Sequence, residues 1–232
     1  LVKAAVTALS DSPEFEADRA GLERVLDRRR RVSEDYFNTM AGRLDKKYCP
    51  GRSWEGIAHL LLHLVPCVEI ADLGAGEGVI GNLMARRAKR VYCVDNARKM
   101  VQFGSEMAKR YGIDNLEYRL GDIEAVPLEA ASVDVALLSQ ALHHALHPET
   151  ALAEARRILR PGGLLLILDL NEHNFEQART LYADRWLGFN QNTLYRWLKE
   201  AGFVNAEVSL ICRDPEPPQL ETLLATARKA EA

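Results

Sequence analysis

The sequence has little net charge, few cysteines and no long apolar run, and each absence narrows the range of functions. Its four cysteines form no C-x-x-C pair, which suits a reducing cytoplasm. No apolar stretch approaches the roughly 20 residues of a membrane-spanning helix. The net charge of −3 argues against a chain that coats nucleic acid through bulk positive charge. We therefore expect a cytoplasmic, globular protein without a membrane anchor.

The 232 residues, of which 47% are hydrophobic, are enough to bury a sizeable core. Residues 1–45 lack any strand signal and are predicted to form an N-terminal helical segment, and residues 46–232 a second domain. Leu22, Val25 and Leu26 follow helical spacing, and this amphipathic pattern predicts a homodimer through the N-terminal helices. The arginines at 28–31 lie among acidic residues at helical pairing distance, which indicates a solvated face.

From residue 53 onward, apolar strands alternate with amphipathic helices, which is typical of a parallel, doubly wound sheet. A proline-rich loop, RDPEPPQ, separates the last two strands and suits a hairpin. The predicted fold is α/β, with a Rossmann-like, seven-stranded, mostly parallel sheet whose last strand is antiparallel. The predicted strands are 68–73, 90–94, 116–120, 133–138, 164–170, 204–211 and 220–227.

A glycine-rich turn, GAGEG, follows the first strand and opens a helix, which predicts a small-molecule site. The pattern from Gly76 through Gly78 to Gly81 matches a dinucleotide fingerprint, and Asp95 follows about 20 residues later, where an acid meets ribose hydroxyls. A nicotinamide enzyme is therefore one alternative. Asp72 favours another ligand, because its carboxylate would repel a pyrophosphate. The ammonium group of S-adenosylmethionine would instead be attracted to it.

Five motifs in order resemble those of class I S-adenosylmethionine-dependent methyltransferases. They are ADLGAGEG, VYCVDNARKMV, YRLGDIEAVPL, DVALLSQALHHALHPE and ILRPGGLLLILDL. The resemblance implies S-adenosylmethionine as cofactor and an unidentified small molecule as methyl acceptor. It also implies a set of cofactor-binding residues at the turn and the strand ends. These are Asp72, Gly74, Gly76, Gly78, Asp95, Asn96, Met100, Gly121, Asp122, Ile123, Ser139 and Gln140.

The flanking segments resemble the methyltransferase regions fused to ArsR-type winged-helix regulators. This resemblance implies an alternative function, a domain that senses S-adenosylmethionine or S-adenosylhomocysteine with little or no catalysis. The opening residues LVKAAVTAL would then be the end of a helix that follows a DNA-binding domain. DNA would be a partner only through that winged helix, which is absent from this chain.

Histidines after the fourth strand are candidates for catalysis. His143 and His144 lie where a general base would meet the acceptor, since imidazole titrates near neutrality. His143 and His147 also have a spacing that suits a metal, but no carboxylate or cysteine completes a site nearby, and no metal is expected. The wider site is predicted to use aromatic residues, as a lid over the cofactor and as a wall of the acceptor pocket. The lid candidates are Tyr36, Phe37 and Tyr48, and the wall candidates are Tyr182 and Trp186.

Overall fold

The computed structural model describes residues 12–40 and 54–231. The chain divides into two compact units, Leu1–Ala58 and His59–Ala232, which are described separately. In the first, helix α2 (Pro13–Met40) exposes Leu22, Val25 and Leu26 at helical spacing. Dimerisation through this face stays a prediction, as does a domain boundary near residue 45, which lies outside the described residues.

The second unit is built on a seven-stranded sheet in the order β3-β2-β1-β4-β5-β7-β6. Neighbouring strands from β3 to β5 are parallel, whereas β7 runs antiparallel to both β5 and β6. This arrangement confirms the predicted α/β fold and its antiparallel last strand. The strands are β1 (Glu69–Leu73), β2 (Arg90–Asp95), β3 (Leu116–Leu120), β4 (Val133–Ser139), β5 (Leu159–Leu170), β6 (Phe203–Arg213) and β7 (Glu221–Lys229).

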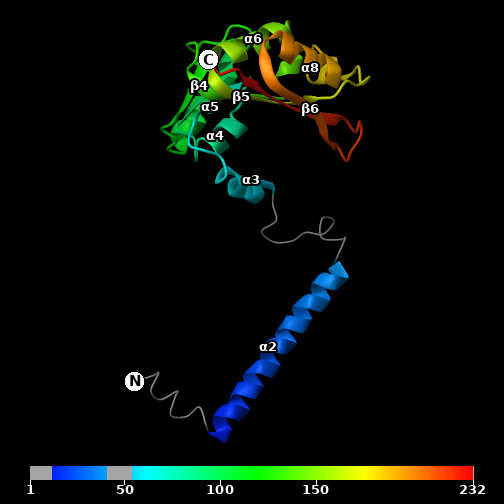
Figure 1. The fold of residues 1–232 in the computed structure, drawn as a ribbon. Helices are drawn as coiled ribbons and strands as arrows, with labels where there is room; N and C mark the ends of the chain where they lie inside the picture. Colours follow the sequence, from blue (N-terminus) through cyan, green and yellow to red (C-terminus); the bar gives the residue numbers. More distant parts are fainter. Residues whose placement is uncertain (1–11, 41–53, 232) are drawn as a thin grey trace. The chain divides into compact units, whose positions relative to one another are not determined.

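Helices cover the sheet on two faces because strand residues alternate between them. Helices α4 (Val79–Met84) and α5 (Arg98–Arg110) contact β2 and β3, while α6 (Pro148–Ile158) and α8 (Gln191–Glu200) contact β4 to β7 (Figure 1). The alternation divides the apolar residues into two buried cores, one against each layer of helices. The remaining described helices are α3 (Trp54–Leu62), the 3-10 turn η1 (Leu142–His144) and α7 (Ala178–Leu181).

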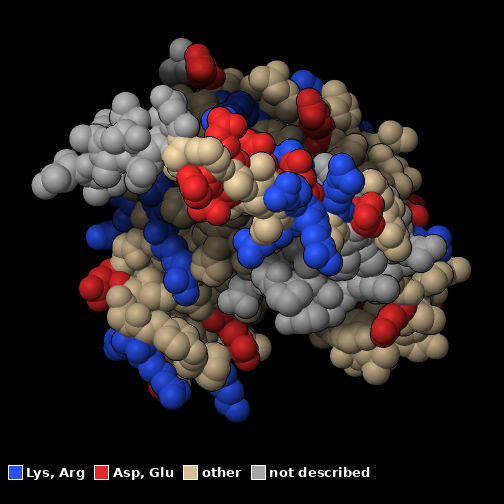
Figure 2. Space-filling view, turned by 90° about the horizontal axis from the view of Figure 1, so that it is seen from below, with Lys and Arg blue, Asp and Glu red and all other residues tan. Residues whose placement is uncertain are grey.

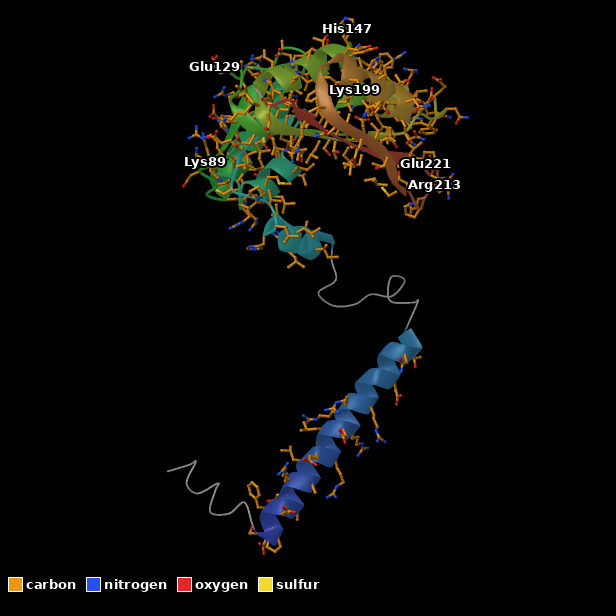
Figure 3. All side chains as sticks on the ribbon, in the orientation of Figure 1. Lys89, Glu129, His147, Lys199, Arg213 and Glu221 are labelled. Atoms are coloured by element: carbon orange, nitrogen blue, oxygen red, sulfur yellow. The ribbon has the colours of Figure 1, made fainter. Side chains whose placement is uncertain are left out.

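The last two strands extend beyond the rest of the sheet as a hairpin. Figure 3 shows Arg213 and Glu221 together near its tip, where they are partners in the register of β6 and β7. Residues 214–220 connect them, and Leu220 accepts a hydrogen bond from the backbone N–H of Asp214 at 2.8 Å. This hairpin contributes one wall to the region beyond the carboxyl end of β5, where Asn171 donates a hydrogen bond to the backbone oxygen of Glu221.

The charges on one face of the molecule are mixed in sign. In the view of Figure 2, Lys and Arg side chains lie interspersed with Asp and Glu, without a broad region of one sign. Among the described helices, none combines the length and apolar character that crossing a bilayer requires. A cytoplasmic location stays a prediction.

Candidate functional site

The carboxyl ends of β1, β2 and β4 surround a cavity of about 340 Å³, which we call the first cavity. This is the edge at which parallel α/β sheets bind ligands, and the volume lies within the range of about 300–1,000 Å³ of small-molecule sites. Its lining residues are Gly74, Asp95, Asn96, Asp122, Ile123, Glu124, Gln140, Ala141, His144, Ala145, Leu146 and Arg185.

The glycine turn after β1 is held against the end of β2 by its own backbone. The N–H groups of Gly74 and Ala75 donate to the carbonyl of Val94 at 2.8 and 3.0 Å, and the N–H of Gly76 donates to Oδ2 of Asp95 at 2.8 Å. Gly74 has a φ of +75°, and a Cβ placed there would lie 2.5 Å from the Cβ of Ala141. Only glycine therefore fits between the turn and the loop after β4.

Asp95 and Asp122 present acceptor oxygens to the first cavity from the ends of β2 and β3. Asp95 accepts hydrogen bonds from the N–H of Gly76 and, through Oδ1, from the N–H of Ala97 at 2.8 Å. Asp122 accepts from the N–H of Glu124 at 2.9 Å through one oxygen. Because a carboxylate has about four lone-pair sites, both residues keep the capacity to accept hydroxyl or amino donors from a ligand.

Asp72, in contrast, lies beneath the turn and does not line the first cavity. It is 2% exposed, and burial raises its pKa to about 7, although a hydrogen bond from the backbone of Gly81 opposes this rise. The negative charge of Asp95 raises the pKa further. Asp72 therefore faces Gly81 of α4 and is not part of the cavity wall.

The structure brings about half of the predicted cofactor-binding residues to the first cavity. Those that line it are Gly74, Asp95, Asn96, Asp122, Ile123 and Gln140, whereas Asp72, Gly76, Gly78, Met100, Gly121 and Ser139 do not. Gly78 packs instead against Tyr118, whose hydroxyl donates to the backbone oxygen of Glu77 at 3.0 Å. Gln140 has a φ of +52°, a strained value for a residue with a side chain, which is common at functional sites.

Glu124 and Ala141 belong to the wall of the first cavity although sequence reasoning missed them. Oε1 of Glu124 accepts from the N–H groups of Leu146 and His147 at 2.6 and 3.0 Å, which ties the loop after β3 to the loop after β4. Their positions directly after predicted strand ends were the available signal. Arg185 also lines the first cavity, but no sequence signal indicated this, because it follows the short helix α7, far along the chain.

His143 lies in a buried cluster behind the first cavity. Its Nδ1 lies 2.7 Å from Oδ1 of Asp169, and its Nε2 lies 3.6 Å from Oδ1 of Asp184. Burial by itself would lower the pKa of His143, but the hydrogen bond and charge of Asp169, with the charge of Asp184, raise it above its usual value. Both carboxylates were missed in the sequence. The signal for Asp169 was one acid within the apolar stretch LLLILDL.

His144 is exposed and lies between the first cavity and a second cavity of about 310 Å³. The second cavity is lined by Gln140, His143, His144, Leu170, Tyr182, Asp184, Asp214, Pro218 and Leu220. Gln140 and His144 are common to both walls, so the two cavities adjoin. Any molecule in the second cavity would therefore lie next to a ligand of the first.

The predicted aromatic wall is present only in part. Tyr182 lines the second cavity, whereas Trp186 packs against Phe189 and Trp197 and donates through Nε1 to the carbonyl of Ala145 at 3.0 Å. Trp186 thus supports the loop after β4 from behind. The lid candidates lie outside what the structure describes, Tyr48 as a residue and Tyr36 and Phe37 as side chains.

Comparison with known proteins agrees with this geometry. A family described as "Methyltransferase domain" matches residues 71–167. The chain is 28% identical over 218 residues to the demethylmenaquinone methyltransferase of Protochlamydia amoebophila, which covers 82% of this chain and 84% of that protein. It is 37% identical over 138 residues to an uncharacterised 37.1 kDa protein of a Streptomyces fradiae transposon, of which it spans 38%, and 57% of this chain is covered.

Solved structures show the same fold. Phosphoethanolamine N-methyltransferase 2 of Haemonchus contortus, solved in complex with S-adenosyl-L-methionine, superposes with a TM-score of 0.64 and 15% sequence identity. The match covers 77% of this chain and 53% of that one. A special relationship to ArsR-type fusions is not shown by these comparisons, and it stays a prediction. Residues 71–167 thus match a methyltransferase domain, and the second unit shares its fold with a solved methyltransferase.

Proposed function

We propose that this protein transfers a methyl group from S-adenosylmethionine to a small-molecule acceptor. The observation that carries the proposal is the first cavity, where side chains from three strand ends meet beside a turn that only glycine can form. When bound, S-adenosylmethionine supplies a methyl group on a sulfonium, which is already a strong electrophile. The protein's task is then to hold donor and acceptor together and to exclude water.

The residues of the first cavity fit the parts of this cofactor. Asp95 has free lone pairs for the two ribose hydroxyls, because its present partners are two backbone N–H groups. Asp122 offers an acceptor for an adenine amino group, and Ile123 an apolar surface for the ring. Asn96 lies at the same wall, and Gly74 leaves room for the methionine portion.

The second cavity is the proposed site of the acceptor. It adjoins the first through Gln140 and His144, so an acceptor there would lie close to the donor. We assign His143 and His144 to the removal of a proton from acceptors that must lose one. Asp169 supports this role, since its contact with Nδ1 of His143 keeps the other ring nitrogen directed at Asp184 and the second cavity.

Calorimetry and turnover test the proposal in sequence. The chain is first titrated with S-adenosylhomocysteine, and then assayed with S-adenosylmethionine against phenolic, carboxylic and amine acceptors, with release of S-adenosylhomocysteine as the signal. We expect saturable binding and turnover with at least one acceptor class. Asp114→Asn, at an exposed turn residue away from the cavity, is a matched control for Asp95→Asn. Absence of binding to the wild-type chain would rule the proposal out.

A further inference from the structure

A cluster of His143, His144 and Asp184 lies at the wall of the second cavity. One potential ligand atom from each of the three side chains lies within 4.8 Å of the others. The segments that carry them are η1, directly after β4, and the loop after α7. The sequence interpretation found no carboxylate near these histidines because Asp184 is distant along the chain. The fold brings it to them.

Asp184 is the unusual member of this cluster. Its side chain is 2% exposed, yet its Oδ1 has no hydrogen-bond partner among the residues that the structure describes. The nearest cationic group is Nε2 of His143, and 3.6 Å is too long for a hydrogen bond. An uncompensated carboxylate oxygen inside a protein is costly, and buried charges are normally paired or coordinate a metal. The charge of Asp169, fully buried on the other side of His143, adds to the need for a positive charge.

The separation between His143 and Asp184 suits a shared ion. Two ligands at about 2.0–2.1 Å from a tetrahedral metal lie roughly 3.3 Å from each other, close to the 3.6 Å between His143 and Asp184. Asp169 holds Nδ1 of His143 at 2.7 Å and accepts hydrogen bonds from the backbone N–H groups of Leu142 and Leu170 at 3.0 and 2.7 Å. A carboxylate behind a ligating histidine is the usual arrangement that orients the ring toward a metal.

We infer that His143, His144 and Asp184 bind a divalent first-row transition metal ion of the Zn²⁺ type. Two imidazoles and one carboxylate favour such an ion over Mg²⁺ or Ca²⁺, which prefer oxygen ligands alone. Three protein ligands leave a coordination position open toward the second cavity. The inference goes beyond the proposed function but uses the same two histidines: with a metal bound they would act as ligands, and the ion would lower the pKa of a bound acceptor hydroxyl.

Metal binding by the full chain tests this inference directly. The protein is stripped with a chelator and titrated with CoCl₂, whose visible absorption reports the geometry of bound cobalt, and then with ZnCl₂ by calorimetry. We expect one ion per chain, and at least a tenfold loss of affinity in Asp184→Asn. Asp214→Asn is the matched control, because it alters another carboxylate of the same cavity that is exposed. It is expected to bind as the wild type does.

Further variants keep the test decisive. His147→Ala removes an exposed imidazole (Figure 3) that directly precedes α6 and lies outside the cluster, so metal affinity should not change. If Asp184→Asn fails to fold, the exposed His144→Gln replaces it, with the same tenfold loss expected. Equal affinity in wild type and the cluster variants, or no cobalt bound at all, would overturn the inference. Binding of S-adenosylhomocysteine to the metal-free chain, measured in parallel, shows separately whether the proposed function holds.

Discussion

Two regions at the same edge of the sheet each contain one buried aspartate, and the two aspartates differ in their hydrogen-bond partners. Asp72 is buried at the end of β1 with a hydrogen bond from the backbone of Gly81, and burial raises its pKa to about 7. Asp169 is fully buried at the end of β5, where it contacts His143 and accepts hydrogen bonds from backbone N–H groups. The charged form of Asp72 is therefore disfavoured by burial, whereas the carboxylate of Asp169 is held by several hydrogen bonds.

The difference separates the proposed roles of the two regions. The donor region combines the glycine turn after β1 with the ends of β2 and β3, and the geometry of its turn depends on backbone conformation and small residues. The acceptor region around Asp169 joins β4, β5 and the segment after α7 through side chains. We therefore expect substitutions in the first to act mainly on cofactor binding, and substitutions in the second to act mainly on stability and on chemistry in the second cavity.

The largest effect is expected for Asp169→Ala. This substitution leaves His143 without its partner and strands the backbone N–H groups of Leu142 and Leu170, so the free energy of unfolding should fall by about 3–5 kcal/mol. Chemical denaturation measures the change, with Asp214→Ala as an exposed control that should cost less than about 0.5 kcal/mol. A loss of stability no greater than that of the control would contradict the stabilising role of Asp169.

The same comparison explains what the sequence could and could not predict. Six of the seven strands were placed to within two residues because apolar runs and the glycines and prolines between them mark their ends. The fifth begins five residues earlier than predicted, because the segment 160–163, interpreted as a helix stop, is part of β5. Asp95 and Asp122 were identified because strand ends are local features. Asp184 was not, since its relation to His143 arises from the return of the chain after β5. The position of Asp72 below the turn also required the structure, because the strand direction alone does not give the path of its side chain.

Asp72→Asn is expected to change how the free energy of unfolding depends on pH. A carboxyl whose pKa is raised from 3.8 to about 7 keeps its proton to a higher pH in the native state than in the unfolded state. Its contribution to stability is therefore complete below about pH 4 and is lost as the pH rises toward 7. Asparagine keeps the shape without the charge, so the variant should exceed the wild type in stability at pH 8 by on the order of 2–4 kcal/mol. Denaturation at pH 5, 6.5 and 8 checks this, and a difference that does not change with pH would contradict it.

Gly74→Ala tests whether the donor region depends on a close approach of the backbone. The new Cβ would meet Ala141 at 2.5 Å in a residue that already has a φ of +75°. We expect the affinity for S-adenosylhomocysteine to fall about 100-fold, or about 2.7 kcal/mol. Gly112→Ala is the matched control, because its φ is +64° but a Cβ there meets no atom within 4 Å. Equal losses in both variants would mean that backbone strain, and not the fit against the loop after β4, controls binding.

Asp95→Asn has the smallest expected effect of the four. The amide keeps one acceptor oxygen but loses the charge that strengthens hydrogen bonds to ribose hydroxyls, so affinity should fall about tenfold, or about 1.4 kcal/mol. Calorimetry with S-adenosylhomocysteine measures it beside Asp114→Asn, which should match the wild type. An Asp95→Asn variant that binds as tightly as the control would place the ribose elsewhere.

The most direct test of the central claim is one calorimetric comparison of two ligands on the wild-type chain. The glycine turn contains a literal dinucleotide pattern, but the proposed function assigns the first cavity to S-adenosylmethionine because Asp95 and Asp122 at its wall fit the ribose and the adenine. It predicts saturable binding of one S-adenosylhomocysteine per chain and no saturable binding of NADH. Saturable binding of NADH without binding of S-adenosylhomocysteine would contradict it.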